Sequence, residues 1–81
     1  MNFYAYILKS QRDNKFYYGS TNDIEMRLKK HNKGDVRATK SRRPFELHYF
    51  ETFNSRSDAF NREMFWKSID GYKWLKSNQI I

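Results

Sequence analysis

Residues 3–20 read FYAYILKSQRDNKFYYGS, and this stretch decides the fold. Two segments, Phe3 to Lys9 and Lys15 to Ser20, are rich in aromatic and apolar residues and predict β-strands. The polar residues Gln11 to Asn14 predict the turn between them. Apolar side chains occupy both faces of the first segment, which indicates a central strand. The stretch therefore predicts an antiparallel hairpin whose first strand has a neighbour on each side.

The register of this hairpin decides whether Tyr6 and Tyr17 lie on the same face of the sheet. If the turn has an even length, Tyr6 pairs with Gly19 and Leu8 pairs with Tyr17. The two tyrosines then lie on one face as diagonal neighbours, roughly 7–8 Å apart at the backbone, and their hydroxyls can converge on one small group. An odd length would send them to opposite faces. On this stretch alone, two tyrosines in the core are the better interpretation.

Composition narrows the class of protein. The chain has 81 residues, which predicts a single domain over residues 1–81, and 19% of its residues are aromatic, which supplies bulk for a small core. It has no cysteine, which excludes disulfides, thiolate zinc sites and a cysteine nucleophile. The longest apolar run, Phe3 to Leu8, is too short to span a membrane, and we expect a cytoplasmic protein.

The charge is strongly positive and unevenly distributed. Sixteen Lys and Arg residues against nine Asp and Glu residues give a net charge of +7. Residues 29–43, the basic stretch, contain one acid, Asp35, and these basic side chains: Lys29, Lys30, Lys33, Arg37, Lys40, Arg42 and Arg43. Such clustering favours a DNA-binding footprint over a surface that only keeps the protein soluble. A membrane surface is a weaker alternative.

The capping and breaking residues in the rest of the chain predict one more strand and three helices, which gives an α+β fold. The first helix is expected to begin at a capping box at residues 22–25 and to run to about Asn32, with Gly34 as its stop, and a strand from Phe45 to Phe53 follows Pro44. The second helix is capped by Ser55 and runs to about Ile69, and after a break at Gly71 the last helix covers Tyr72 to Asn78.

Two polar residues of the first predicted helix share its apolar face. Arg27 and His31 are spaced i, i+4 and point along the side on which Ile24 and Leu28 form the apolar stripe. The arginine either extends along the core edge to pair with a carboxylate or delivers its planar, permanently charged group to a phosphate. The helix alone does not decide between these alternatives.

The second long helix carries an unexpected carboxylate. Glu63 projects from an apolar face that we expect to comprise Ala59, Phe60, Met64 and Trp66. A buried carboxylate needs a counter-ion, a proton or a metal. The structural interpretation is an ion pair with Lys67 or Arg27. The alternative is ligation of a single Mg²⁺ or Mn²⁺, completed by water and substrate.

Together these residues resemble a known family. The chain is similar to the GIY-YIG nuclease domain in Tyr4-Ala5-Tyr6, Tyr17-Tyr18-Gly19, the Arg27-x-x-x-His31 spacing and the lone downstream Glu63. It resembles most the compact stand-alone bacterial members, in stretches such as residues 18–23, 39–44 and 67–68. The family includes the nuclease domain of a bacterial excision-repair subunit. Tyr4 replaces the glycine of the first triplet and Tyr18 the isoleucine of the second; we assign both to packing.

The resemblance implies a fold and a site. The fold is a three-stranded antiparallel sheet flanked by helices, in the order β-β-α-β-α-α. The activity is divalent-metal-dependent cleavage of a DNA phosphodiester. By position, Tyr6 and Tyr17 would orient the attacking water, and one of them would accept its proton. Arg27 would neutralise phosphoryl charge and Glu63 would hold one Mg²⁺ or Mn²⁺, with His31 and Lys40 as auxiliary residues.

The expected function is a DNA endonuclease of repair or recombination, acting with a partner protein that supplies specificity and forming a monomer or weak dimer. The alternatives are a non-catalytic nucleic-acid-binding domain that retains the fold and a protein-interaction module. DNA cleavage that requires Glu63 and a metal would distinguish the enzyme from the non-catalytic binding domain. DNA binding that weakens steeply with salt would distinguish both from the protein-interaction module.

Overall fold

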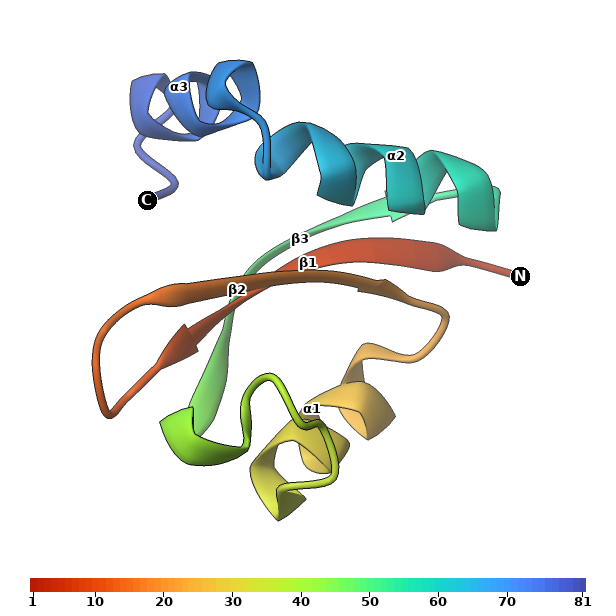
Figure 1. The fold of residues 1–81 in the computed structure, drawn as a ribbon. Helices are drawn as coiled ribbons and strands as arrows, with labels where there is room; N and C mark the ends of the chain where they lie inside the picture. The colour runs from red at the N-terminus through yellow and green to blue at the C-terminus, as the bar shows by residue number, and fades with distance from the viewer.

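The computed structural model describes residues 1–81 and consists of one sheet between two layers of helices (Figure 1). The strands are β1 (Phe3–Ser10), β2 (Phe16–Thr21) and β3 (Phe45–Phe53). They pair antiparallel in the order β2-β1-β3. The first strand is therefore central, as its two apolar faces predict, and β2 is an edge strand.

The helices divide between the two faces of the sheet. Helix α1 (Ile24–Lys33) and the short 3₁₀ turn η1 (Lys40–Arg42) lie on one face, and α2 (Arg56–Trp66) and α3 (Ile69–Ser77) lie on the other (Figure 1). The predicted α+β architecture and its β-β-α-β-α-α order are confirmed. None of the helices combines the length and apolar character needed to cross a membrane.

The hairpin has the even-length register. The Ser10 N–H donates a 2.9 Å hydrogen bond to the Lys15 carbonyl and closes the turn. Tyr6 pairs with Gly19, and Leu8 pairs with Tyr17. Side chains alternate across a strand, so both tyrosines project from the face that α1 covers. Of the two registers that the sequence left open, the structure therefore has the one that brings both phenols to one face.

The ends of α1 follow ordinary capping chemistry. Asp23 is the N-cap and accepts a hydrogen bond of 3.0 Å from the Met26 N–H, so the helix begins one residue later than a box opened by Asn22 would place it. At the other end Gly34 adopts a left-handed φ of 86° and its N–H returns to the His31 carbonyl. The predicted stop at Gly34 is confirmed.

The predicted boundary between the last two helices is wrong. Helix α2 begins after the Ser55 cap, as expected, but ends at Trp66, and Ser68 caps α3. Gly71 lies inside α3 and is buried. A Cβ at this position would lie 1.7 Å from the Phe65 carbonyl oxygen. Gly71 therefore permits close contact between the two helices instead of breaking one.

The sheet separates two cores of different character. The α2/α3 side holds Ala5, Ile7, Trp66 and Leu75 with several partly buried aromatic rings. The α1 side is smaller and is built around Tyr6, Leu8 and Phe45. The buried side of α2 consists of Ala59, Glu63 and Trp66, whereas Phe60 and Met64 are 48% and 39% exposed. The predicted apolar face of α2 was therefore wrong in these two residues.

Candidate active site

A buried chain of hydrogen bonds fixes Tyr6 on the α1 side of the sheet. The Tyr6 hydroxyl lies 3.1 Å from His31 Nε2, and His31 Nδ1 lies 2.8 Å from the Thr39 hydroxyl. Tyr6, His31 and Thr39 are each at most 2% exposed. Strand β1, helix α1 and the segment before η1 each contribute one member, so the chain joins three separate parts of the sequence.

We assign the directions of these hydrogen bonds from Thr39, because the roles of the two His31 ring nitrogens depend on the tautomer. Its hydroxyl has one proton, which it donates to the Val36 carbonyl at 3.3 Å. It therefore accepts the proton of His31 Nδ1, which leaves His31 Nε2 as an acceptor. Tyr6 must then donate its hydroxyl proton to His31. The Tyr6 oxygen can then accept a hydrogen bond, and Arg27 lies close enough to donate one.

Burial sets the protonation states of this pair. Desolvation, assisted by the positive charge of Arg27, lowers the pKa of His31 to about 4, so the imidazole is neutral at physiological pH. Desolvation also raises the pKa of Tyr6 above 10, although Arg27 opposes that change. A neutral phenol that donates to a neutral imidazole is the stable arrangement. Proton transfer from Tyr6 to His31 would be strongly unfavourable.

Tyr17 and Arg27 border the same hydroxyl. The Tyr17 ring packs edge-on against the His31 imidazole with 5.0 Å between their centres, and Tyr17 is only partly buried. Arg27 is also partly buried and lines a pocket of about 130 Å³ with Thr21, Asn22, Asp23, Met26 and Lys30. Its guanidinium is close enough to the Tyr6 hydroxyl to favour the phenolate. An anion in this pocket would meet both Arg27 and Lys30.

Glu63 lies on the other side of the sheet. Its Oε1 accepts a 2.8 Å hydrogen bond from the Ser20 hydroxyl, and its Oε2 accepts one of 2.7 Å from Lys67 Nζ. Because Ser20 alternates with Gly19 along β2, the carboxylate approaches the strand from the α2 side. The counter-ion of Glu63 is therefore Lys67, the i, i+4 partner, and not Arg27.

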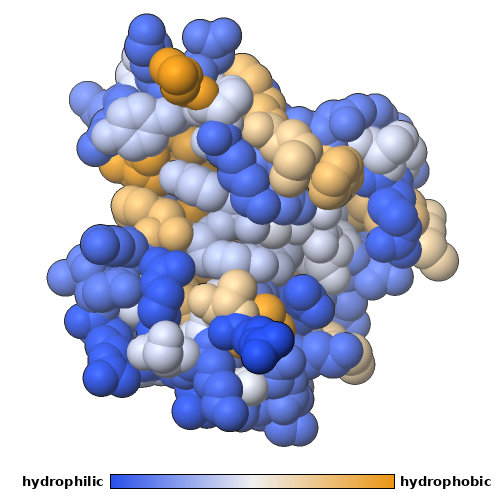
Figure 2. Space-filling view, in the orientation of Figure 1, coloured by the Kyte–Doolittle hydropathy of each residue, from blue (hydrophilic) through white to orange (hydrophobic).

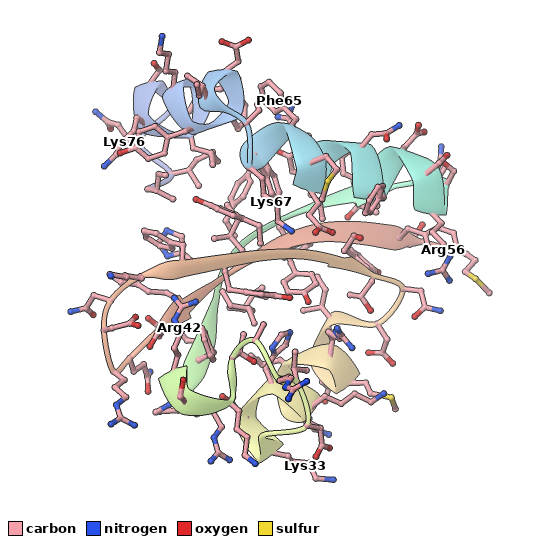
Figure 3. All side chains as sticks on the ribbon, viewed as in Figure 1. Lys33, Arg42, Arg56, Phe65, Lys67 and Lys76 are labelled. Atoms are coloured by element: carbon pink, nitrogen blue, oxygen red, sulfur yellow. The ribbon has the colours of Figure 1, made fainter.

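The two sides meet at the edge formed by β2. Gly19 has no side chain, and the Tyr6 ring extends across it; a Cβ there would lie 2.4 Å from the Tyr6 oxygen. The negative charge of Glu63 contributes to raising the pKa of Tyr6, so the carboxylate is within electrostatic reach of that oxygen. Figure 3 shows Lys67 extending from the end of α2 towards β2. Tyr6, Tyr17, Arg27 and His31 thus lie together on the α1 side, and Glu63 approaches β2 from the α2 side.

The donor atoms at this edge suit a particular kind of metal site. The structure has no group of three or more His, Cys, Asp and Glu side chains that could enclose an ion. Mg²⁺ commonly takes one or two carboxylates, keeps several waters and completes its shell with substrate phosphate. Glu63 fits such a single, largely hydrated ion, and it does not fit a cage made of protein ligands alone.

The basic stretch lies on the α1 side, where the surface is predominantly hydrophilic in the lower half of Figure 2. Two of its arginines are engaged in the scaffold. Arg42 forms a 3.1 Å ion pair with Asp13 and packs over the Phe45 ring, and Arg43 donates to the Lys40 carbonyl. Lys29 forms only an exposed pair with Glu25. The exposed side chains without an ion pair are Lys30, Lys33, Arg37, Lys40 and Arg43.

Sequence reasoning missed two residues that hold the site together. Thr39 orients His31, and Ser20 holds Glu63. Ser20 had a detectable signal, because the alternation that turns Gly19 towards Tyr6 turns Ser20 towards α2. Thr39 had none, because its position depends on how the irregular segment between α1 and η1 folds back onto the helix.

Comparisons with known proteins agree with this architecture. The family model of the GIY-YIG catalytic domain matches residues 2–74. A UPF0213 protein of Bacillus licheniformis is 43% identical over 67 residues, covering 82% of this chain and 68% of the relative. One from Pediococcus pentosaceus is 40% identical, covering 96% and 85%. The solution structure of the UPF0213 protein from Bacillus halodurans is 36% identical, with a TM-score of 0.55 over 95% of this chain and 84% of that chain.

The match to the GIY-YIG catalytic domain places this small α+β domain in a nuclease-type family. The chain is a member of the GIY-YIG family. Within that family it is similar to the stand-alone bacterial UPF0213 proteins over most of its length. The resemblance read from the two tyrosine triplets is therefore confirmed.

Proposed function

We propose that this protein is a divalent-metal-dependent endonuclease that hydrolyses DNA phosphodiester bonds at the edge of β2. One observation carries the proposal. The Tyr6 hydroxyl is buried and hydrogen-bonded to His31, and its oxygen lies over Gly19 beside Arg27. A phenol that only filled the core would not need a glycine beneath its oxygen or a cation beside it.

Tyr6 would act by positioning water. Its oxygen can accept a hydrogen bond from a water molecule while its own proton stays on the bond to His31. Burial raises the pKa of Tyr6, which opposes phenolate formation in the resting protein. We therefore assign Tyr6 to orientation of the attacking water, His31 to orientation of Tyr6, and proton acceptance to the more exposed Tyr17.

Arg27 and Glu63 would act on the phosphate from the two sides of the strand. The guanidinium of Arg27 is planar and permanently charged, which suits it to neutralise the developing charge on phosphoryl oxygens. Glu63 would hold one Mg²⁺ or Mn²⁺ ion. When bound, such an ion supplies Lewis-acid stabilisation of phosphoryl charge. Lys30, Lys33, Arg37 and Lys40 would bind the DNA backbone beyond the cleaved bond.

The biological setting is a further part of the proposal. The unpaired basic side chains can bind phosphate without reading sequence. We propose that it acts on intermediates of DNA repair or recombination, with a partner protein that supplies specificity. The same salt-dependent binding would operate with or without that partner.

One observation favours a second candidate function. Both carboxylate oxygens of Glu63 already have protein partners, Ser20 and Lys67. A non-catalytic DNA-binding domain that retains the fold would use Glu63 only in this structural way. The two candidates predict different effects of removing the charge of Glu63.

The decisive experiment is cleavage of labelled duplex, branched and flapped DNA with and without Mg²⁺ or Mn²⁺. We expect metal-dependent nicking by the natural protein and a loss of at least about 100-fold in Glu63→Gln, with DNA binding retained. Glu46→Gln removes an exposed carboxylate of β3 and provides the control for the same change of charge. Binding without cleavage under all conditions, unaltered in Glu63→Gln, would favour the binding domain.

A further inference from the structure

Lys67 holds the position that a metal ion would need beside Glu63. Its ammonium lies 2.7 Å from Glu63 Oε2, while the Ser20 hydroxyl occupies Oε1. The Glu63 side chain is 11% exposed, whereas the Lys67 side chain is 44% exposed. The carboxylate is therefore reached from solvent mainly on the side where the ammonium lies.

The backbone of Lys67 is fixed although its side chain is not. Lys67 is the C-cap of α2, and its N–H donates to the carbonyls of Glu63 and Met64. Ser68 caps α3 in the next position, and Gly71 packs directly against the end of α2. The only freedom left to Lys67 is rotation of a long, half-exposed side chain, which can leave the carboxylate without any change of fold.

We propose that Lys67 is a resident counter-ion that a divalent cation must displace from Glu63. The inference rests on the metal-binding role proposed above for this carboxylate. Without substrate, the lysine neutralises Glu63 and keeps its affinity for metal low. When an ion binds, the ammonium moves away because two cations cannot share one carboxylate oxygen without strong repulsion.

This arrangement differs from an ordinary surface pair. An exposed i, i+4 pair between lysine and glutamate contributes little, because water screens both charges. Glu63 is largely buried, so it needs a cation at all times. Lysine suits a replaceable cation, because its ammonium is a single point charge on a flexible stem and does not clamp both oxygens as arginine can.

The test is the affinity for Mn²⁺, measured without DNA by electron paramagnetic resonance of the free ion. We expect Lys67→Met to bind Mn²⁺ at least about fivefold more tightly than the natural protein. Lys67→Arg should bind Mn²⁺ no more tightly than the natural protein, because the positive charge remains and the arginine guanidinium can bind both carboxylate oxygens of Glu63. Lys73→Met removes an exposed lysine of α3 and should leave the affinity unchanged.

Two further measurements keep the result interpretable. Adding Glu63→Gln to Lys67→Met should abolish the gain, which places the ion on this carboxylate. If Lys67→Met is unfolded without metal by circular dichroism, Mn²⁺ should refold it, because the ion then replaces the missing charge. Equal Mn²⁺ affinity in the natural protein, Lys67→Met and Lys67→Arg, or no binding by any of them, would overturn the proposal.

Nicking assays on the same proteins separate this inference from the proposed function. Tighter Mn²⁺ binding in Lys67→Met without DNA cleavage by any variant would support competition between Lys67 and the ion for Glu63, and it would contradict the endonuclease activity. Metal-dependent cleavage with no effect of Lys67 on Mn²⁺ binding would support the endonuclease and contradict the competition.

Discussion

The two faces of the sheet have the same backbone but different side-chain chemistry. On the α2/α3 side, Ile7, Trp66 and Leu75 pack into an apolar, aromatic core. On the α1 side, the centre is the hydrogen-bonded chain of Tyr6 and His31, with Leu8 beside it. The first face contributes most of the apolar burial, and the second places polar groups in fixed directions at low exposure.

The difference indicates a division of labour. A domain of 81 residues buries little apolar surface, so one well-filled face must stabilise the fold. The other face can then hold buried polar groups that cost stability unless each finds a partner. Tyr6, His31 and Thr39 form hydrogen bonds with one another, which lets the α1 side of the sheet remain ordered without a large core.

The largest expected effect is loss of packing on the α2/α3 face. Leu75 is fully buried, and Leu75→Ala should lower the free energy of unfolding by about 3–5 kcal/mol through lost transfer energy and a cavity. Ile69→Ala, in the same helix but at a side chain that is 76% exposed, should change it by less than about 0.5 kcal/mol. Urea unfolding followed by circular dichroism measures both, and similar losses would contradict the assigned core.

The next largest effect is expected from substitution of Gly19 on the α1 side of the sheet. In Gly19→Ala the new Cβ would lie 2.4 Å from the oxygen of the buried Tyr6 ring. We expect a loss of up to about 3 kcal/mol in the free energy of unfolding, with disruption of the hydrogen bond to His31. Tyr6→Leu removes the distal ring atoms, so the loss caused by Gly19→Ala should shrink in that background. An additive double mutant would show that the clash is not the cause.

These effects also indicate what the sequence could predict. Alternation reduced the hairpin to two arrangements of Tyr6 and Tyr17, and the turn length, which the sequence left open, decides between them. The role of Gly71 was not predictable, because a glycine that breaks a helix and one that lets two helices touch look alike in sequence. The same holds for the exposed Phe60, which apolar patterning places inside.

The candidate site divides in the same way. Arg27 and His31 share a helix face by simple periodicity, and the structure brings both to Tyr6. The sequence could not show that Glu63 reaches the site from the opposite side of the sheet, since that depends on how α2 packs across β2. Local spacing was sufficient within an element, and packing between elements was not.

Acid should weaken the hydrogen-bonded α1 side of the sheet before the apolar α2/α3 side. His31 has a pKa of about 4 in the folded protein and about 6.5 when unfolded, so the unfolded chain binds the proton more tightly between these values. Stability is therefore present above pH 6.5 and is lost as the pH falls, by about 2 kcal/mol between pH 7 and pH 5. Asp13, whose pKa is lowered chiefly by the Lys15 N–H, titrates below this window.

Urea unfolding at several pH values measures this loss. His48→Gln changes the other histidine, which is exposed and contacts the Ile80 carbonyl, and it controls for the loss of an imidazole. His31→Gln should be less stable at pH 7 but should lose most of the dependence between pH 7 and pH 5. An undiminished pH dependence in His31→Gln would mean that another group is responsible.

The smallest expected effect on stability gives the sharpest contrast between the faces. Tyr49 on the α2/α3 side donates a 2.6 Å hydrogen bond to Glu51, and burial, followed by that carboxylate, raises the pKa of Tyr49 to about 12. Tyr6 donates a similar bond to His31 on the other side. Tyr49→Phe and Tyr6→Phe each remove one hydroxyl and should each cost about 1 kcal/mol in the free energy of unfolding.

Their effects on DNA cleavage should differ. Only the Tyr6 oxygen lies over Gly19 within reach of Arg27, so Tyr6→Phe should reduce the nicking rate by about 100-fold or more at unchanged DNA affinity. Tyr49→Phe should leave the rate nearly unchanged, because its hydroxyl is held by Glu51 within the apolar side. Equal loss of activity in the two variants would mean that cleavage follows general stability, and the division between the faces would then fail.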